Sequence, residues 1–447
     1  MHKRRCFLFP LIVLVFTTAF VWQLPAVLKA IPSRYVARLP QPLQQLGERE
    51  HVEVLPTAAP LANAASLLEN TFQPTASAES TALQPPAISS STPQDNGAKV
   101  VLDSTTVPTK TPAPTPTKTP IPIPPSARLE GFQHQFQTWN NCGPATIAMS
   151  LSYFELYLDQ EQAAAVLKPN PEDRNVSPYQ MAAYVNDETA YAAIERTNGT
   201  LDTVKRLVGG GSPVIIELGI EPPGEYRWLG WYGHYLLIVA YDDASQQFWV
   251  YDSWFGTSEA PMENANPEGL VLSYIDADYQ WRQFNRNYIV LYAPDRAAEV
   301  ANIIGSDMDD DVMWQNSLVR VQAELRQEPE NAFLWFNLGT VFNALGDYER
   351  AAAAFDQARA IGLPWRMLWY QFGLYEAYYQ VGRYEDVILL ADVTLQDRPY
   401  FEESFYYKGM ALAVLGDLSL ARINLKDAVD FNPNYHPAVE ALLQLNT

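Results

Sequence analysis

The sequence predicts an α+β domain followed by an all-α repeat array, both placed behind an extended stalk and an N-terminal apolar segment. In the middle of the chain, apolar residues at helical spacing after Cys142 give way to β-branched runs from residue 213 onward. This order indicates helices first and antiparallel strands afterwards. In the last third, four prolines recur at intervals of 35, 35 and 34 residues, which is typical of stacked helical pairs: Pro329, Pro364, Pro399 and Pro433.

Length and composition limit the possible functions. With 447 residues and 48% hydrophobic residues, the chain can form two or three domains with real cores. Its formal net charge of -21 argues against nucleic acid as a partner. Cys6 lies in the apolar N-terminal segment and Cys142 is the other cysteine, so no intramolecular disulfide is expected outside the membrane. An unpaired thiol in a secreted chain suggests that the thiol is used.

The first 128 residues predict a membrane anchor and a stalk. Basic residues 2–5 precede an uncharged apolar run that begins at Cys6 and continues to Leu28, so residues 1–30 are expected to be a transmembrane signal anchor. The basic end would be cytoplasmic, and the folded domains would lie outside a single-pass cell membrane protein. Secretion after signal cleavage is the alternative. Residues 31–128 are rich in Pro, Thr and Ser, which predicts a disordered stalk.

Cys142 is a candidate nucleophile because it stands where a polar loop becomes a helix. Residues 140–146 read Asn-Asn-Cys-Gly-Pro-Ala-Thr, and Pro144 suits a first helical turn. Apolar residues follow at helical spacing: Ile147, Leu151, Phe154 and Leu158. The unpaired N–H groups and the dipole at this helix end stabilise an anion, so the thiol tends toward the nucleophilic thiolate. The alternative is a small buried cysteine that fills space.

A cysteine nucleophile needs a base and a group that orients the base. His2 and His51 precede the predicted domains, His436 lies in the helical array and His134 is eight residues before the cysteine, which leaves His234. His234 opens a predicted strand over 234–241, and residues 248–252 return as a second strand. Antiparallel pairing would bring Asp252 toward His234. The alternatives are a core histidine and a turn-forming aspartate.

These residues carry a family resemblance. The segments 137–146, 233–235 and 251–253 resemble the papain-like peptidase family C-39 in its branch of stand-alone domains, and the resemblance spans residues 129–294. It implies a papain-like domain over residues 129–298, with a helical lobe and an antiparallel sheet. It also implies that Cys142 attacks a peptide carbonyl, that His234 acts as base and then acid, and that Asp252 orients His234.

The same resemblance implies that a glutamine before the cysteine helps to form the oxyanion hole. Papain-like enzymes usually have this glutamine six residues before the cysteine, but position 136 is Phe. Gln137 is the expected residue because it is nearest to the cysteine in sequence, and Gln133 and Gln135 are the alternatives. Four aromatic residues are candidates for a substrate cleft, unless they pack onto the sheet: Trp139, Trp228, Trp231 and Tyr232. No cofactor or metal ion is expected.

Residues 310–447 match the tetratricopeptide pattern. The first copy has Trp335, Leu338, Gly339 and Phe342 at the characteristic positions, a later copy repeats the pattern from Phe405, and the middle copy departs from it after Gly373. Three repeats are expected to stack, with a leading helix over 312–327 and a capping helix from Pro437. Their concave face would bind a protein partner or an extended peptide; a rigid spacer is the alternative.

Together these features predict an extracytoplasmic, membrane-anchored cysteine peptidase that acts on peptide or protein substrates and uses its repeats for docking. Two other classes fit the same fold. One is a catalytically inactive peptide-binding scaffold, and the other is a thiol acyltransferase with the same triad. The proline spacing further predicts that residues from about 310 onward are dispensable for the folding of residues 129–298.

Overall fold

The structure is a computed structural model of the 447-residue chain. It describes residues 23–28, 36, 39–47, 54–61, 63–69, 123–222, 224, 229–258, 263–264 and 266–445. The apolar run that was predicted as a membrane anchor, up to residue 22, lies outside the described residues, as do residues 70–122 of the predicted stalk. None of the helices in the described part of the chain combines the length and apolar character needed to span a bilayer.

A single antiparallel sheet forms the centre of the first folded part. Its strand order is β2-β7-β3-β4-β5-β6, and β1 pairs with β4 beside this path. The strands are β1 (Ser126–Arg128), β2 (Ala192–Arg196), β3 (Val214–Ile220), β4 (Tyr232–Asp242), β5 (Gln247–Asp252), β6 (Leu270–Ser273) and β7 (Tyr288–Tyr292). The central strands β3, β4 and β7 are buried along nearly their whole length, as expected for apolar runs covered on both faces.

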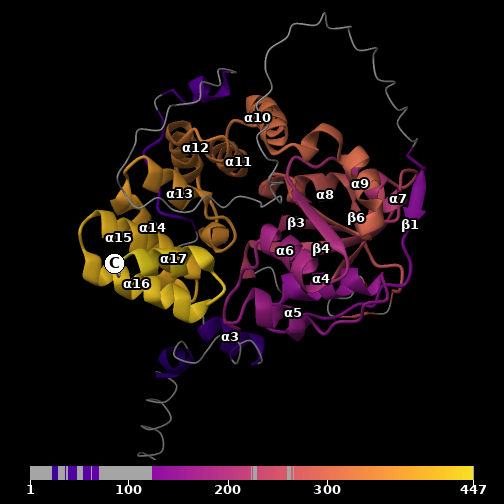
Figure 1. The fold of residues 1–447 in the computed structure, drawn as a ribbon, viewed down its shortest axis with the longest axis horizontal. Helices are drawn as coiled ribbons and strands as arrows, with labels where there is room; N and C mark the ends of the chain where they lie inside the picture. Colours follow the sequence, from indigo (N-terminus) through magenta and orange to yellow (C-terminus); the bar gives the residue numbers. More distant parts are fainter. Residues whose placement is uncertain are drawn as a thin grey trace, which may run out of the picture.

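Helices cover both faces of this sheet (Figure 1). On one face α4 (Cys142–Ser152), α5 (Gln160–Leu167) and α6 (Pro178–Glu188) share a core with the sheet. On the other face the core is shared with α7 (Leu201–Gly209), α8 (Tyr274–Trp281) and α9 (Ala297–Ile304). An antiparallel sheet with these helices over residues 126–296 fits a papain-like domain.

The helices and strands largely follow the sequence prediction, with three differences. Residues 270–275 also read as a strand in the sequence, but strand β6 ends at Ser273, whose side chain accepts a hydrogen bond from Asp276 N and so begins α8. Strand β2 was not predicted, because Ala192–Arg196 is a short run with few β-branched residues. Strand β1 lies within the region that was predicted to be disordered stalk.

The second folded part is helical and follows the predicted spacing of helix pairs. It consists of α10 (Asp310–Gln327), α11 (Ala332–Ala344), α12 (Tyr348–Ile361), η6 (Trp365–Trp369), α13 (Gly373–Gln380), α14 (Tyr384–Asp397), α15 (Glu402–Val414), α16 (Leu418–Phe431) and α17 (His436–Gln444). Helices α11 and α12 pack closely at Gly339, where an added Cβ would lie 2.6 Å from the Phe355 ring. The middle copy differs, since a short 3₁₀ turn replaces the beginning of its first helix. The assignment to tetratricopeptide repeats stays a prediction.

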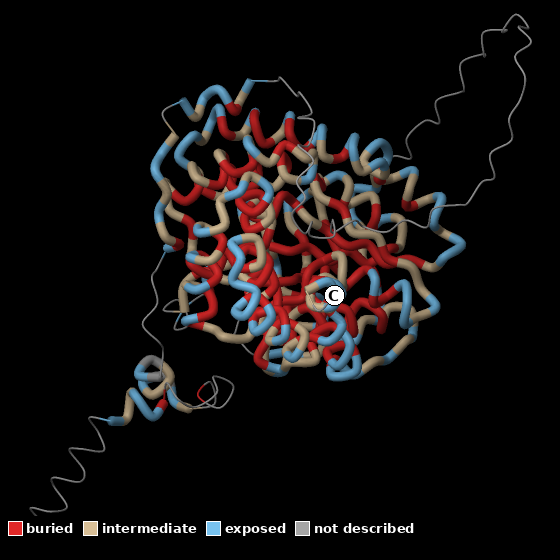
Figure 2. Tube along the Cα trace, turned by 60° about the vertical axis from the view of Figure 1, so that its left-hand side comes forward, coloured by how far each residue is buried: buried red, intermediate tan, exposed pale blue. Residues whose placement is uncertain are grey.

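The two parts share a buried core. Trp231 and Phe284 come from the sheet-containing part but belong to the same buried cluster as the helical residues. The Trp231 ring stacks on Phe284 and also contacts Phe333 of α11 and Tyr370 of the helical part, with ring centroids 5.6–5.8 Å apart. Figure 2 shows buried residues in red through the interior of the folded chain. This shared cluster argues against the expectation that residues 129–298 fold alone.

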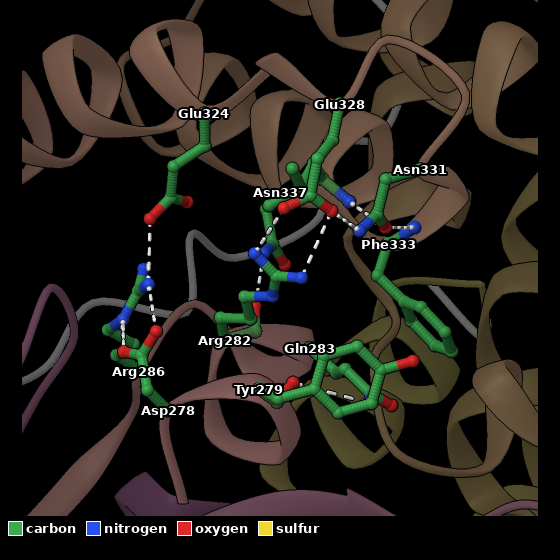
Figure 3. Close-up of polar contacts among 11 residues, drawn as sticks. Asp278, Tyr279, Arg282, Gln283, Arg286, Glu324, Glu328, Asn331, Phe333 and Asn337 are labelled. Carbon is green, nitrogen blue, oxygen red and sulfur yellow. Dashed lines mark hydrogen bonds and ion pairs between the residues drawn. The ribbon is translucent and has the colours of Figure 1, made fainter. Parts of the chain in front are cut away.

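Charged residues reinforce this boundary (Figure 3). The Arg282 guanidinium forms a bidentate pair with Glu328, with N···O distances of 2.7 and 3.0 Å. Arg286 bridges Asp278 of α8 and Glu324 of α10 at 2.8 and 2.7 Å. Because bidentate guanidinium–carboxylate pairs have a defined geometry, these contacts fix the orientation of α10 relative to α8.

The prediction of a disordered stalk over residues 31–128 is wrong for one segment, because that segment packs on the helical part. Leu55 is 1% exposed, and its N–H donates to Leu363 O at 2.9 Å. Arg359 Nε donates to Pro56 O at 2.8 Å, and Gln322 Nε2 donates to Leu67 O at 3.0 Å. Residues 54–61 and 63–69 lack the dense prolines of the later stalk and carry leucines that α10 and α12 bury. This segment is called the N-terminal strap below.

We expect Leu55→Ala to lower the free energy of unfolding by about 2–4 kcal/mol, because it removes a fully buried side chain and leaves a cavity. Urea unfolding followed by tryptophan fluorescence measures this change. Val54→Ala is the matched control, since Val54 is 43% exposed. Equal stability of the Leu55→Ala variant and the control would show that the strap does not contribute to the folded core.

Candidate active site

Cys142 is the first residue of α4, as the sequence predicts. Asn140 adopts a left-handed conformation with φ 55°, and the first helical hydrogen bond runs from Ala145 N to Asn141 O at 2.9 Å. The N–H groups of Cys142 and Gly143 therefore stand in the first turn, where a helix supplies no partner for them. The thiol is free and half-buried. This position gives an anionic sulfur or oxygen nearby N–H donors and the favourable end of the helix dipole.

His234 and Asp252 form a buried pair. The distance from His234 Nε2 to Asp252 Oδ1 is 2.8 Å, and the two residues are 3% and 4% exposed. Asp252 Oδ1 also accepts the backbone N–H groups of Trp254 at 2.7 Å and Phe255 at 3.0 Å. These bonds hold the carboxylate in one position, so it fixes the orientation of the imidazole ring.

A β-bulge brings this pair together. The turn pairs Asp242 with Gln247 and Ala240 with Trp249, and continuing that register would place Asp252 opposite Leu237, on the other face from His234. The register shifts by one residue between Ile238 and Ala240, so Asp252 instead lies opposite Leu236. Residues 234 and 236 share a face, and the Asp252 carboxylate therefore reaches the His234 ring.

The charges at this site favour a protonated imidazole. Burial disfavours the charged ring, but the charge and hydrogen bond of Asp252, followed by a hydrogen bond to Cys142, raise the pKa of His234 to about 10. Burial opposes ionisation of Asp252, but His234 and the backbone N–H groups lower the pKa of this carboxyl below its usual value.

His134 is a site residue that sequence reasoning passed over. Its Nε2 lies 2.8 Å from the backbone oxygen of Asp252, so this nitrogen carries the hydrogen and donates it. Burial lowers the pKa of His134, and the ring packs edge-on against Phe136 and Tyr251. His134 therefore positions the end of β5. Its spacing from Cys142 was the one sequence signal available.

Gln137 lies beside Asp252 and Ser253. Gln137 N donates to Ser253 O at 2.7 Å, and Ser253 Oγ donates to Gln137 Oε1 at 2.9 Å. These bonds leave the Nε2 amide group of Gln137 outside this pairing. The alternative Gln135 uses both ends of its side chain, because Nε2 donates to Leu158 O and Oε1 accepts from Gln160 N. The structure thus favours Gln137 over Gln135, and its oxyanion role stays a prediction.

The four predicted cleft residues lie in different environments, and one of them is outside the described residues. Trp231 is buried in the core between the two parts, where its Nε1 donates to Gln283 Oε1 at 2.7 Å, so its prediction as a cleft residue is wrong. Tyr232 is half-buried and packs edge-on against Trp254, which in turn contacts the His234 ring. Trp139 is half-buried, and its Nε1 donates to Glu172 at 3.3 Å. Trp228 lies outside the described residues.

Two further features bear on the candidate catalytic residues, namely a pocket and the arrangement of metal-ligating side chains. A pocket of about 500 Å³ lies at the boundary between the two parts, but it is lined by residues such as Tyr279, Glu328 and Phe333 and by none of the candidate catalytic residues. Within the described ranges, no group of three or more His, Cys, Asp or Glu side chains is arranged to hold a metal ion.

Buried acids lie near Cys142, where the loop before α6 meets α15. Lys168 Nζ donates to Asn140 O at 3.2 Å and to Asp173 O at 2.8 Å, and Asn432 Nδ2 donates to Glu402 Oε1 at 2.6 Å. Burial, followed by repulsion from Asp173, raises the pKa of Glu402 to about 8. Burial also raises the pKa of Asp173 to about 6, although Lys168 opposes this shift.

These shifts predict that the free energy of unfolding falls as the pH rises from about 4 to about 8, because Asp173 loses its contribution between 3.8 and about 6 and Glu402 loses its contribution between 4.5 and about 8. Both carboxyls bind protons more tightly in the folded chain, so their contribution is complete below their ordinary values of 3.8 and 4.5 and is lost above the folded values. Each retained proton changes stability by about 1.4 kcal/mol per pH unit. Urea unfolding of Glu402→Gln should give a flatter profile, whereas exposed Glu385→Gln should not.

The comparisons with known proteins concern this same part of the chain. Residues 129–286 match the Peptidase_C39 like family. A solved structure described as a candidate C39-like peptidase from Bacillus anthracis is 15% identical, with a TM-score of 0.29, and the match covers 37% of this chain and 97% of that chain. No curated protein matches the chain. The part that carries Cys142, His234 and Asp252 is thus the part that is similar to the Peptidase_C39 like family.

Proposed function

We propose that the chain is a cysteine peptidase, with Cys142 as nucleophile, His234 as acid and base, and Asp252 as the residue that orients His234. The observation that carries this proposal is the buried His234–Asp252 pair, 2.8 Å apart, whose imidazole lies near enough to Cys142 at the start of α4 for that residue to contribute to the raised pKa of His234. The similarity of residues 129–286 to the Peptidase_C39 like family supports the same reaction class.

The reaction follows from these positions. The Cys142 thiolate attacks the peptide carbonyl carbon and forms a C–S bond, while the N–H groups at the start of α4 and the Gln137 amide stabilise the oxyanion. The C–N bond breaks as protonated His234 gives its proton to the leaving amine. Water then attacks the thioester carbonyl and gives a proton to His234, the C–S bond breaks, and the carboxylic acid leaves while Cys142 returns to a thiolate beside protonated His234.

The first test measures the reactivity of the thiol. At pH 6, iodoacetamide should alkylate Cys142 in the folded chain at least ~10-fold faster than it alkylates free cysteine, because the cation at His234 maintains the thiolate. The same chain unfolded in urea should lose this excess rate. A folded-state rate no greater than that of free cysteine would remove the basis for nucleophilic catalysis and favour a binding scaffold.

The second test measures cleavage. A defined mixture of peptides is incubated with the full chain or with Cys142→Ala, and new termini are identified by mass spectrometry. Cleavage by the wild-type chain alone supports the peptidase. If an added amine such as glycinamide is incorporated at the acyl side and no free acid forms, the chain is an acyltransferase, which the same triad also permits.

We also propose that the folded parts lie outside the cell membrane, behind the basic and apolar N-terminal segment, and that the helical part docks a protein partner. The charge asymmetry of residues 2–22 supports this orientation. Protease digestion of intact cells and of lysed cells tests it. Digestion of the folded parts only after lysis would contradict the proposed location.

A further inference from the structure

Three arginine side chains gather around Trp369 at the boundary between the two parts. The guanidinium carbons of Arg174, Arg366 and Arg398 lie 5.3, 5.3 and 5.6 Å from the centroid of the Trp369 ring. Arg174 belongs to the loop before α6, whereas the other two arginines come from the helical part. Trp369 is fully buried. The cluster is therefore built by both parts of the chain.

Two of these cations form no ion pair with the residues that the structure describes. Arg398 pairs with Asp397 at 3.0 Å, but within the described residues no carboxylate forms an ion pair with Arg174 or Arg366. Arg366 is 3% exposed and uses Nη1 to donate to the backbone oxygens of Leu229 and Trp231. The Nε atoms of Arg174 and Arg366 are buried without a hydrogen-bond partner. Burying unpaired cations is costly, so an anion bound to Arg174 and Arg366 would stabilise this arrangement.

The acids nearest to Arg174 in sequence make contacts with other groups. Glu172 accepts a hydrogen bond from Trp139 Nε1 at 3.3 Å, and the Asp173 carboxylate accepts from Asn175 N at 3.0 Å. Burial, and then the positive charge of Arg398, lower the pKa of Arg174 to about 10. An anion bound at Arg174 would relieve both effects.

Aromatic rings contact the faces of the Arg174 and Arg366 guanidinium groups and do not use their in-plane donors, of which Arg366 Nη1 alone donates to backbone oxygens of the described residues. The Arg174 guanidinium carbon lies 4.8 Å from the Trp139 ring centroid, and that of Arg366 lies 4.0 Å from the Tyr232 ring centroid. A cation–π contact uses the face of the guanidinium, whereas its N–H donors point outward in the plane. A carboxylate matches these donors with two parallel hydrogen bonds.

The cluster lies beside the candidate nucleophile. Trp139 precedes Cys142 by three residues, and Tyr232 precedes His234 by two. Tyr370 interacts electrostatically with both the arginine cluster and Cys142. Burial, followed by the negative charge of Cys142, raises the pKa of Tyr370, whereas the positive charges of Arg366 and Arg174 oppose this shift. A peptide bound at Cys142 would therefore pass within reach of Arg174, which is half-buried and so more accessible than Arg366.

We propose that Arg174, supported by Arg366 and Arg398, binds a carboxylate of the peptide substrate next to Cys142. The carboxylate belongs either to an acidic side chain or to a free C-terminus of the peptide. The position of this subsite rests on the proposed peptidase function, but the binding of the carboxylate does not require turnover. The helical part thus contributes directly to substrate selection.

The test uses Cys142→Ala in the full chain and three pentapeptides. One has alanines around a central glutamate with both ends blocked, the second has glutamine in place of glutamate, and the third is all alanine with a free C-terminal carboxylate. Calorimetry should show at least ~10-fold tighter binding of one carboxylate peptide than of the glutamine peptide. The first and third peptides distinguish a side-chain carboxylate from a terminal one.

Arg174→Gln should reduce this preference to about onefold, and Arg174→Lys should retain part of it because the charge remains but the fork is lost. Arg128→Gln is the matched control, since Arg128 also lies over a tryptophan, Trp249, at 5.2 Å, but on the strand edge away from His234. Equal affinities of the three peptides, no binding at millimolar concentration, or the same preference in Arg174→Gln would overturn the proposal.

A second measurement keeps the inference testable if Arg174→Gln is unstable. Iodoacetate carries a carboxylate and iodoacetamide does not, so wild-type Cys142 should react with iodoacetate with a saturable rate that the free-carboxylate or glutamate peptide inhibits. A linear, uninhibited rate contradicts the subsite. Slow alkylation by both reagents contradicts instead the proposed catalytic function, so the two failures are distinguishable.

Discussion

Replacing His234 with alanine is expected to reduce peptide cleavage at least ~1000-fold, because the thiolate loses its cation and the leaving amine loses its proton donor. Asp252→Asn should cost less, since an amide oxygen can still accept the N–H groups of Trp254 and Phe255 and the proton of His234 Nε2. Asp252→Ala removes this acceptor altogether and should cost more than Asp252→Asn. Turnover of a peptide found in the cleavage assay measures all three variants.

The acidic residues of the β4–β5 turn provide the control. Asp242 accepts bonds from Ala244 and Ser245 within the turn, and Asp243 pairs with Lys205 at 3.1 Å and accepts from Tyr274. Asp242→Ala and Asp243→Ala should therefore leave turnover unchanged. Full activity of Asp252→Ala together with loss of activity in either control would contradict the strand register and assign the third role to the turn.

A chain that ends at residue 304 is expected to aggregate rather than fold independently. Truncation exposes Trp231 and Phe284, whose rings pack against Phe333 and Tyr370 in the full chain, and leaves Arg282 and Arg286 without Glu328 and Glu324. Exposed aromatic surface of this size normally belongs to an interface. Size-exclusion chromatography and near-ultraviolet circular dichroism measure the outcome.

Trp231→Ala in the full chain tests the contact between the two parts without removing the helical part. It should lower the free energy of unfolding by about 3–5 kcal/mol, the usual cost of truncating a buried aromatic side chain. A truncated chain that stays monomeric, melts cooperatively and retains the fast alkylation of Cys142 would restore the two independent domains that the proline spacing predicts.

The residues of the candidate site were predictable because each marks the end of an element. Cys142 follows a polar loop before helical spacing begins, and His234 and Asp252 stand at opposite ends of two apolar runs joined by a turn. The bulge that places Asp252 and His234 on one face was not predictable, because no residue in the run 236–240 distinguishes a bulged strand from a regular one. The role of His134 depends on the same strand end and was missed for that reason.

Contacts between the two parts were also hidden in the sequence. Trp231 reads as a cleft aromatic in a loop, but its environment depends on Phe333 and Tyr370, which lie more than 100 residues later. The strap was missed because its leucines stand among prolines and alanines with no helical or strand period. Such residues are buried by tertiary contacts, which local patterns do not encode.

The strap has a consequence for proteolysis. The polypeptide leaves the helical part after residue 69 and rejoins the sheet-containing part at β1, so residues 70–122 connect two separately held points. One cut within them would break the chain without releasing the first 69 residues, because Leu55 and Leu67 remain in the helical core. If the first 69 residues attach the protein to a membrane, such a cut would replace the covalent link between them and the folded parts with the reversible contact of the strap. Shedding would then be controlled by the dissociation rate of the strap.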